Sequence, residues 1–149
     1  MNQRVKRKIR LKKLAEIAGS YAMYDKGYVF SPAERPVLSA EDSALLPPGL
    51  KDRGEFHITI IGPPEMKAVP KGTFEKGVKY EIGGAPSYRG LGRAVDGANE
   101  AYFMVIDWPE AQQFRAKYGL GEKDLHVTVG FKEKDIHNVR KNQTIKESA

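Results

Sequence analysis

A short pattern of alternating apolar and polar residues occurs twice in this chain of 149 residues. The first copy is Phe56-His57-Ile58-Thr59-Ile60, and the second is Leu125-His126-Val127-Thr128-Val129. Alternation with a period of two is typical of a β-strand with one buried face, because successive side chains of a strand point to opposite sides. The pattern therefore predicts two strands, each of which presents a histidine and a threonine opposite its aliphatic residues.

The repetition favours a functional interpretation over an incidental one. The chain has three histidines and four threonines, and two of the histidines are followed two residues later by threonine. Histidine titrates closest to neutral pH, so one copy is suited to accept a proton while the other donates one. The neighbouring hydroxyls are suited to donate hydrogen bonds to phosphate oxygens. The pairs His57/Thr59 and His126/Thr128 predict a site that cleaves a phosphodiester by general acid–base catalysis, without a metal or another cofactor.

The two His-x-Thr motifs, each in an apolar strand, resemble the 2H phosphoesterase superfamily. The resemblance covers roughly residues 54–138, and the flanking residues are most similar to its RNA-repair-like Swiss Army Knife branch. It implies an α+β fold in which two pseudo-symmetric, antiparallel β-rich lobes with outer helices surround a central cleft. It also implies a nucleotide or RNA substrate, either a 2′,3′-cyclic phosphate at an RNA end or a cyclic oligonucleotide of the kind that phage anti-defence (anti-CBASS) enzymes destroy. Either histidine can be the base in this family; we favour His57 as base and His126 as acid.

Composition narrows the class of protein. A hydrophobic fraction of 40% and a charged fraction of 30% suit a single soluble globular domain over residues 1–149. The absence of cysteine excludes disulfides, a thiol nucleophile and cysteine-based zinc sites. No apolar run is long enough to span a membrane, so we expect a cytoplasmic protein without a membrane partner. A metal-dependent alternative would pair the histidines with Asp124 or Asp135, although no spacing here matches a metal-binding motif.

The net charge of +6 comes from the N-terminal segment. Seven basic residues lie within the first 13, and the remaining 18 basic residues face 19 acidic ones, a net charge of −1. Residues 1–18 are predicted to form an amphipathic helix, which has three interpretations: a packing helix with solvated charges, a contact for nucleic acid, or a targeting segment. The second leads to an alternative function, a non-catalytic RNA-binding domain that uses the cleft and this basic arm.

Four further residues are candidates for contact with the substrate. Tyr24 adjoins a turn, Arg89 and Arg93 lie in the glycine-rich stretch 83–97, and Phe131 follows the second motif. Each also has an ordinary structural interpretation as a packing or solvated side chain. Phe131 is expected on the face opposite His126, unless Gly130 turns the chain.

The other elements are predicted from periodicity and from turn residues. The run at 101–108 is almost entirely apolar and predicts a central strand buried on both faces. It should form a hairpin with residues 87–94 through a turn at Asp96-Gly97. A polar, frayed tail is expected at 142–149. The remaining predicted strands lie at 27–30, 54–61 and 74–82, and the remaining predicted helices at 39–46 and 109–118.

Overall fold

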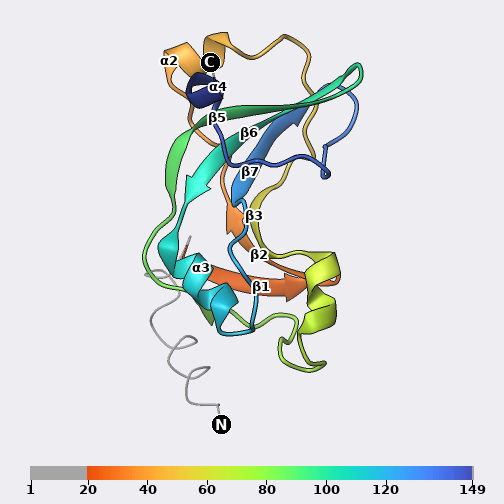
Figure 1. Cartoon of the computed structure of the whole chain (residues 1–149), viewed down its shortest axis with the longest axis vertical. Coiled ribbons are helices and arrows are strands. Elements are labelled where there is room, and N and C mark those ends of the chain that lie inside the picture. The colour runs from red at the N-terminus through yellow and green to blue at the C-terminus, as the bar shows by residue number, and fades with distance from the viewer. Residues whose placement is uncertain (1–19, 149) are drawn as a thin grey trace. The chain divides into compact units, whose positions relative to one another are not determined.

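Seven strands form two antiparallel sheets in the computed structural model, which describes residues 20–148 (Figure 1). The basic segment at 1–18, predicted to be helical, lies outside the described residues. The four-stranded sheet has the order β3-β2-β1-β4 and the three-stranded sheet the order β5-β6-β7. The strands are β1 (Tyr21–Asp25), β2 (Tyr28–Ala33), β3 (Phe56–Ile61), β4 (Tyr80–Glu81), β5 (Ser87–Asp96), β6 (Asn99–Asp107) and β7 (His126–Phe131).

Short helices lie between and after these strands, which confirms the α+β class. They are α2 (Ala40–Ala44), the 3-10 helix η1 (Pro63–Ala68), α3 (Pro109–Ala116) and α4 (Ile145–Ser148). Helix α2 begins as predicted: the Ser39 hydroxyl accepts a hydrogen bond of 3.1 Å from the Asp42 N–H. Helix α3 has Pro109 at its first position, where the missing N–H costs nothing.

The chain forms two compact units, which are described separately. Unit 1 comprises the described residues up to Pro32, together with Thr59–Pro86 and Trp108–Lys123. Unit 2 comprises Ala33–Ile58, Ser87–Asp107 and the described residues from Asp124 onward. Strand β3 therefore passes from unit 2 into unit 1 between Ile58 and Thr59.

Phe74 is the centre of the aromatic core of unit 1. Its ring lies 5.1 Å from Tyr80, 5.1 Å from Tyr118, 6.1 Å from Phe114 and 6.5 Å from Tyr24, measured between ring centroids. The strand predicted over residues 74–82 is reduced to Tyr80–Glu81. Phe74 is buried and Tyr80 packs against it, but glycines with positive φ at 72 and 77 place turns in the segment before Tyr80.

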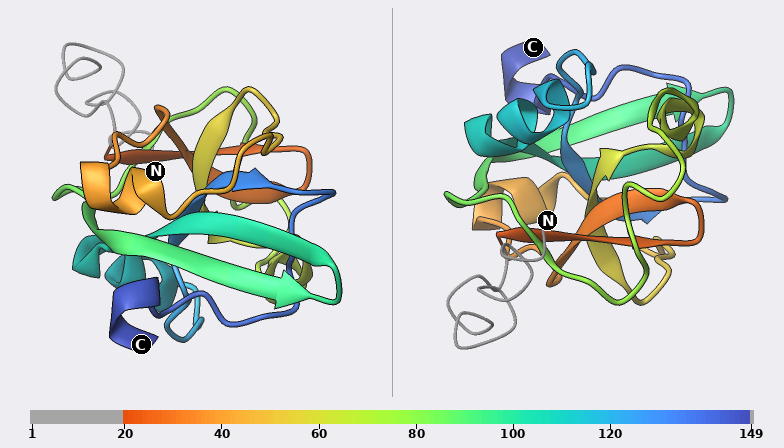
Figure 2. Two further views of the ribbon diagram at one scale, coloured as in Figure 1. Left: turned by 90° about the horizontal axis from the view of Figure 1, so that it is seen from above. Right: turned by 90° about the horizontal axis from the view of Figure 1, so that it is seen from below.

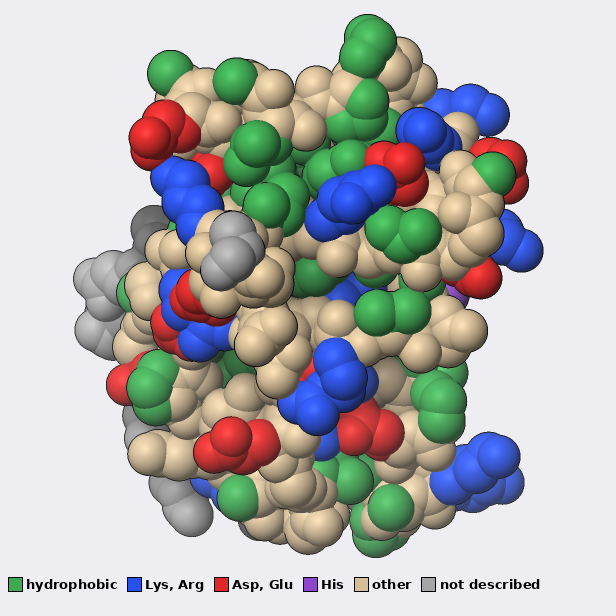
Figure 3. Space-filling view, turned by 45° about the horizontal axis from the view of Figure 1, so that its top comes forward, with side chains coloured by type: hydrophobic (Ala, Val, Ile, Leu, Met, Phe, Trp, Pro, Cys, Tyr) green, Lys and Arg blue, Asp and Glu red, His purple; other side chains and the backbone are tan. Residues whose placement is uncertain are grey.

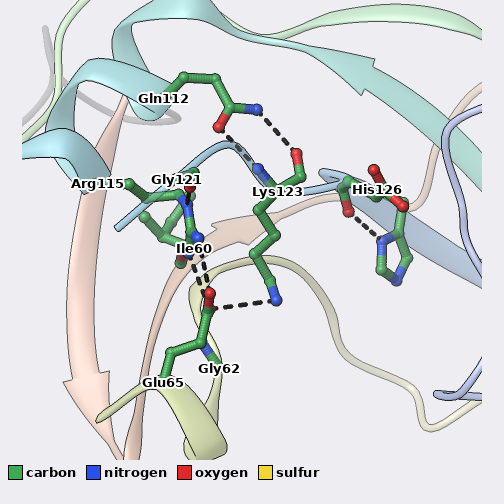
Figure 4. Close-up of polar contacts among 9 residues, drawn as sticks. Ile60, Gly62, Glu65, Gln112, Arg115, Gly121, Lys123 and His126 are labelled. Carbon is green, nitrogen blue, oxygen red and sulfur yellow. Dashed lines mark hydrogen bonds and ion pairs between the residues drawn. The ribbon is translucent and has the colours of Figure 1, made fainter. Parts of the chain in front are cut away.

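A buried arginine joins α3 to the end of β3 in unit 1 (Figure 4). Arg115 is 2% exposed, and its guanidinium donates to the carbonyl oxygens of Ile60 (2.7 Å) and Gly121 (2.8 Å) and to both carboxylate oxygens of Glu65. Burial alone would raise the pKa of Glu65, but bonds from Arg115 and the Gly62 N–H, with the charge of Lys123, lower it to about 2. Each of the three guanidinium nitrogens of Arg115 therefore has at least one hydrogen-bond partner.

Strand β6 is the central strand of unit 2, as predicted. It pairs with β5 over the whole hairpin, which turns at Asp96–Asn99, and with β7 on its other edge (Figure 2). The register places Gly92, Phe103 and Thr128 side by side on one face. A Cβ atom at Gly92 would overlap the Phe103 ring and lie 2.8 Å from the Gln143 carbonyl oxygen. Glycine is thus required there by the space that the ring occupies.

A β-bulge changes the face on which Phe131 lies. The pairing moves from Thr128 opposite Phe103 to Gly130 opposite Tyr102, so Val129 is the extra residue. Phe131 then pairs with Ala101 and joins a buried cluster with Phe103 and Ile136. The expectation that Phe131 faces away from His126 is therefore wrong, and the cause is the extra residue in β7.

The segment after β7 covers the same face of the sheet. Lys141 is buried and its ammonium group donates to the Ile136 carbonyl oxygen, and Thr144 contacts Gly90 of β5. Thr144 and Glu147 cap α4 reciprocally, with bonds of 3.0 Å from each backbone N–H to the other side chain. The predicted frayed tail is instead an ordered segment over the described residues 142–148, because Thr144 supplies both a cap and a packing contact.

Replacement of Arg115 by methionine should destabilise the protein by about 3–5 kcal/mol, because it leaves Glu65 and two carbonyl oxygens without their donor. The measurement is urea unfolding at pH 7. Arg93→Met is the matched control: Arg93 is 46% exposed and paired with Glu100, so its loss should cost at most about 1 kcal/mol. Equal losses for the two variants would contradict the structural role of Arg115.

Gly92→Ala should destabilise by about 1–3 kcal/mol, since the new methyl group must displace the Phe103 ring or the Gln143 backbone. Gly121→Ala is the control, because a Cβ there meets nothing within 4 Å. Thermal unfolding of both variants, compared with the wild type, measures the difference. A Gly92→Ala protein as stable as Gly121→Ala would show that the ring does not need this space.

Candidate active site

His57 and Thr59 lie two residues apart on β3 and project to the same side of the strand. Both side chains are half-buried, while Ile58 and Ile60 between and beyond them are buried in the core. The strand is preceded by an ordered turn in which Gly54, at a φ of +78°, donates its N–H to the Asp52 carboxylate at 2.7 Å. This turn fixes the point at which the chain enters β3.

The environment of His57 favours its neutral form. Burial of the ring is the main cause that lowers its pKa from the ordinary value, and the positive charge of Arg53 lowers it further. The negative charges of Asp135 and Glu55 oppose this change. A histidine that is neutral at physiological pH is suited to accept a proton.

His126 and Thr128 occupy the corresponding positions on β7. The register places His126 opposite Val105 and Thr128 opposite Phe103, so both motif side chains lie on the face that carries the Phe103 ring. The Phe103 ring meets the His126 ring edge-on, with centroids 5.7 Å apart and an interplanar angle of 71°. The packing of β6 therefore sets the orientation of the second imidazole.

One hydrogen bond fixes the tautomer of His126. Its Nδ1 lies 2.9 Å from the Asp124 carbonyl oxygen (Figure 4). A carbonyl oxygen only accepts, so Nδ1 carries a proton in this hydrogen bond. Asp124 is itself fixed, because its carboxylate accepts from the Arg140 guanidinium at 2.6 and 2.9 Å and from the Lys141 N–H at 3.0 Å. The bond from Arg140 is the main cause that lowers the pKa of Asp124.

Asp135 connects the surroundings of the two motifs. Its Oδ2 accepts a hydrogen bond of 3.0 Å from the Thr128 hydroxyl, and its Oδ1 accepts one of 2.8 Å from the Ile136 N–H. The same carboxylate is close enough to His57 to oppose the fall in the pKa of that imidazole. His57, Thr128 and Asp135 are therefore neighbours within unit 2.

The four residues predicted to bind substrate make their main contacts with residues other than the motif histidines. Tyr24 packs on Phe74 in unit 1, and Phe131 is 8% exposed in the buried cluster of unit 2. Arg89 forms ion pairs with Asp107 and Glu147. Arg93 pairs with Tyr102 in the sheet, on the face opposite Phe103 and His126, and its guanidinium contacts Glu100 at 3.3 Å.

Sequence reasoning did not predict the roles of the polar residues that support the motifs, and it considered Asp124 and Asp135 only as possible metal ligands. Asp135, Asp124 and Arg53 act on the histidines or on Thr128, yet none falls inside a His-x-Thr motif. The available signal was position alone: Arg53 and Asp124 each lie just before a motif strand, and Asp135 follows the second. Along the face shown in Figure 3, basic and acidic side chains are interspersed, so charge does not single out a site there.

Over residues 20–148, no group of three histidine, cysteine, aspartate or glutamate side chains is arranged to hold a metal ion. None of the helices found in that range is long and apolar enough to cross a membrane.

Comparison with known proteins identifies the family. The sequence profile of the Swiss Army Knife 2H phosphoesterase domain matches residues 31–137, which include both His-x-Thr motifs and Asp135. No curated protein and no solved structure gives a significant match. Because the profile covers most of the chain, the protein belongs to the 2H phosphoesterases, in the Swiss Army Knife family.

Proposed function

We propose that this protein is a metal-independent phosphodiesterase that hydrolyses a nucleotide or RNA phosphodiester with two histidines. Phosphodiester chemistry in general follows from the family. The observation that supports the two-histidine mechanism is the difference between the imidazoles: the pKa of His57 is lowered by burial, and His126 has its proton fixed on Nδ1. A site that needs one base and one acid benefits from two imidazoles in unlike surroundings.

In this proposal His57 is the base and His126 the acid. His57 takes a proton from the attacking oxygen, and His126 in its charged form gives a proton from Nε2 to the leaving oxygen. Thr59 and Thr128 bring a hydroxyl next to each imidazole, and a hydroxyl that donates a hydrogen bond stabilises the negative charge that develops on the phosphate oxygens. The two motif strands would flank a common cleft, as the family resemblance implies.

The substrate class remains a choice between two phosphodiesters. Residues 31–137 match the Swiss Army Knife family, which by resemblance suits processing of RNA ends that carry a 2′,3′-cyclic phosphate. Cleavage of cyclic oligonucleotide signals suits a small domain equally well. Both would occur in the cytoplasm, and contact of the basic N-terminal segment with nucleic acid would favour RNA.

His57→Ala and His126→Ala should each lower kcat/KM by about 100-fold or more, because each removes a proton-transfer group. The measurement is hydrolysis, in EDTA, of 2′,3′-cyclic nucleotides, RNA ending in a 2′,3′-cyclic phosphate, and cyclic di- and trinucleotides. His137→Ala, which alters the exposed third histidine, should leave the rate unchanged. If the folded wild type cleaves none of these substrates, the non-catalytic RNA-binding alternative is favoured. Activity that depends on an added metal ion would contradict the mechanism.

The dependence of kcat/KM on pH should be bell-shaped, with an acidic limb below the value of about 6.5 for a free imidazole. The sign follows from His57: the base must be neutral, and a lowered pKa keeps it neutral to lower pH. Arg53→Gln removes a charge that lowers this pKa, so the limb should move to higher pH. Arg93→Gln, on the opposite face of the sheet from His126, should leave the limb in place.

A further inference from the structure

The two motifs are alike in sequence but differ in how their hydroxyls are held. Over the described residues, no hydrogen bond is found for the Thr59 side chain, whereas the Thr128 hydroxyl lies 3.0 Å from Asp135 Oδ2. A hydroxyl has one proton to donate, and an ionised carboxylate has none. The proton of Thr128 therefore points to Asp135, and only the lone pairs of Thr128 are left for another group.

A second contact holds the Asp135 carboxylate in place beside Thr128. Asp135 Oδ1 accepts the Ile136 N–H at 2.8 Å, so both carboxylate oxygens are engaged and the side chain is held in place. The phosphate oxygens of a diester are also acceptors and carry negative charge. A Thr128 that offers lone pairs beside a carboxylate is poorly suited to bind them, but well suited to accept a bond from a hydroxyl group.

We infer that Asp135 is a positioning residue that makes the two motifs chemically unlike: Thr59 donates to the phosphate, whereas Thr128 accepts from a hydroxyl group that takes part in the reaction. That hydroxyl belongs to the attacking water or to the ribose next to the scissile phosphate. The inference rests on the proposed two-histidine function. It assigns Thr128 to a different atom of the reacting complex from the one that the motif alone suggests.

Inorganic phosphate is the first probe, because its binding does not require turnover. Thr59→Val should weaken phosphate binding about tenfold, the value of one hydrogen bond to a charged group, in titrations followed by calorimetry or by the NMR signals of the imidazoles. Thr128→Val should change it less than about twofold. Equal weakening by the two isosteric variants would overturn the inference while leaving the two-histidine mechanism intact.

Asp135→Asn provides the opposite test, because it reverses the hydrogen bond. A carboxamide has one oxygen, and if that oxygen stays on the Ile136 N–H, the NH₂ group faces Thr128 and donates to it. Thr128 then turns its own proton outward. Phosphate should bind several-fold more tightly, while kcat falls about tenfold or more. Adding Thr128→Val to Asp135→Asn should remove the contribution of the reversed hydroxyl.

Glu133→Gln is the matched control, since it removes one negative charge from the same loop, and the Glu133 side chain forms no hydrogen bond or ion pair with either motif among the described residues. It should leave phosphate affinity and kcat unchanged within about twofold. If Glu133→Gln tightens phosphate binding as much as Asp135→Asn, simple charge removal explains the effect and the inference fails. Thr128→Ser, which keeps the hydroxyl, should retain most of the wild-type kcat. A loss of kcat as large as that of Thr128→Val would contradict the role inferred for the Thr128 hydroxyl.

The source of the hydroxyl is resolved with a ribodinucleoside monophosphate and its 2′-deoxy counterpart. If Thr128 accepts from water, Thr128→Val lowers kcat by the same factor on both. If it accepts from the ribose, the loss is confined to the ribose-containing compound. An unchanged kcat on every cleaved substrate would overturn the assignment. A wild-type protein that neither binds phosphate nor cleaves any phosphodiester would instead refute the proposed function, and the inference with it.

Discussion

Asp124 holds together the second motif and the segment that covers its sheet. Its backbone carbonyl fixes the proton of His126 on Nδ1, and its carboxylate binds Arg140 and the backbone of Lys141. Because β7 begins at His126, the residue stands where the chain enters the strand. A single position therefore contacts both the second imidazole and the segment that follows β7.

Each unit contains an arginine–carboxylate pair close to a motif strand, and the two pairs differ in how far they are buried. In unit 1 the Arg115 guanidinium is buried, and each of its three nitrogens donates a hydrogen bond to Glu65 or to one of two carbonyl oxygens. In unit 2 Arg140 remains largely in water, and its bidentate bond to Asp124 organises the chain without the cost of burying a charge. Both arginines bind the chain at a motif strand: Arg115 donates to the carbonyl oxygen of Ile60 in β3, and Arg140 binds Asp124 just before β7. The strands are thus anchored by backbone and side-chain contacts that the motifs themselves do not contain.

Local patterns predicted the elements well where periodicity and turn chemistry agreed. The β5–β6 hairpin, the buried β6 and the Ser39 cap all follow from residues within a few positions of one another. Long-range effects were not predictable in this way. Phe74 joins an aromatic cluster instead of a strand, and one extra residue in β7 moves Phe131 to the other face. The ordered segment at 142–148 depends on space beside Gly90 and Gly92, which only the packed sheet reveals.

In the candidate site, too, the residues of the local motifs were predictable and their long-range partners were not. The histidines and threonines were found from a repeated pentapeptide, and their alternation with buried aliphatic residues is what the strands display. The groups that make the two motifs unlike, Arg53 and Asp135, come from loops. A loop residue acquires its partner only through the fold, so its identity in the sequence carried no comparable signal.

The contacts of Asp124 have a consequence for synthesis of the chain on the ribosome. Both motif strands are made before Arg140, Lys141 and Thr144, and these later residues cover the sheet and fix the entrance to β7. When β7 has just left the ribosome, His126 and Thr128 have been made, but the residues that cover the Phe103 side of the sheet have not yet emerged. The surroundings of the second motif are therefore completed only after the residues up to α4 have followed β7 out of the ribosome.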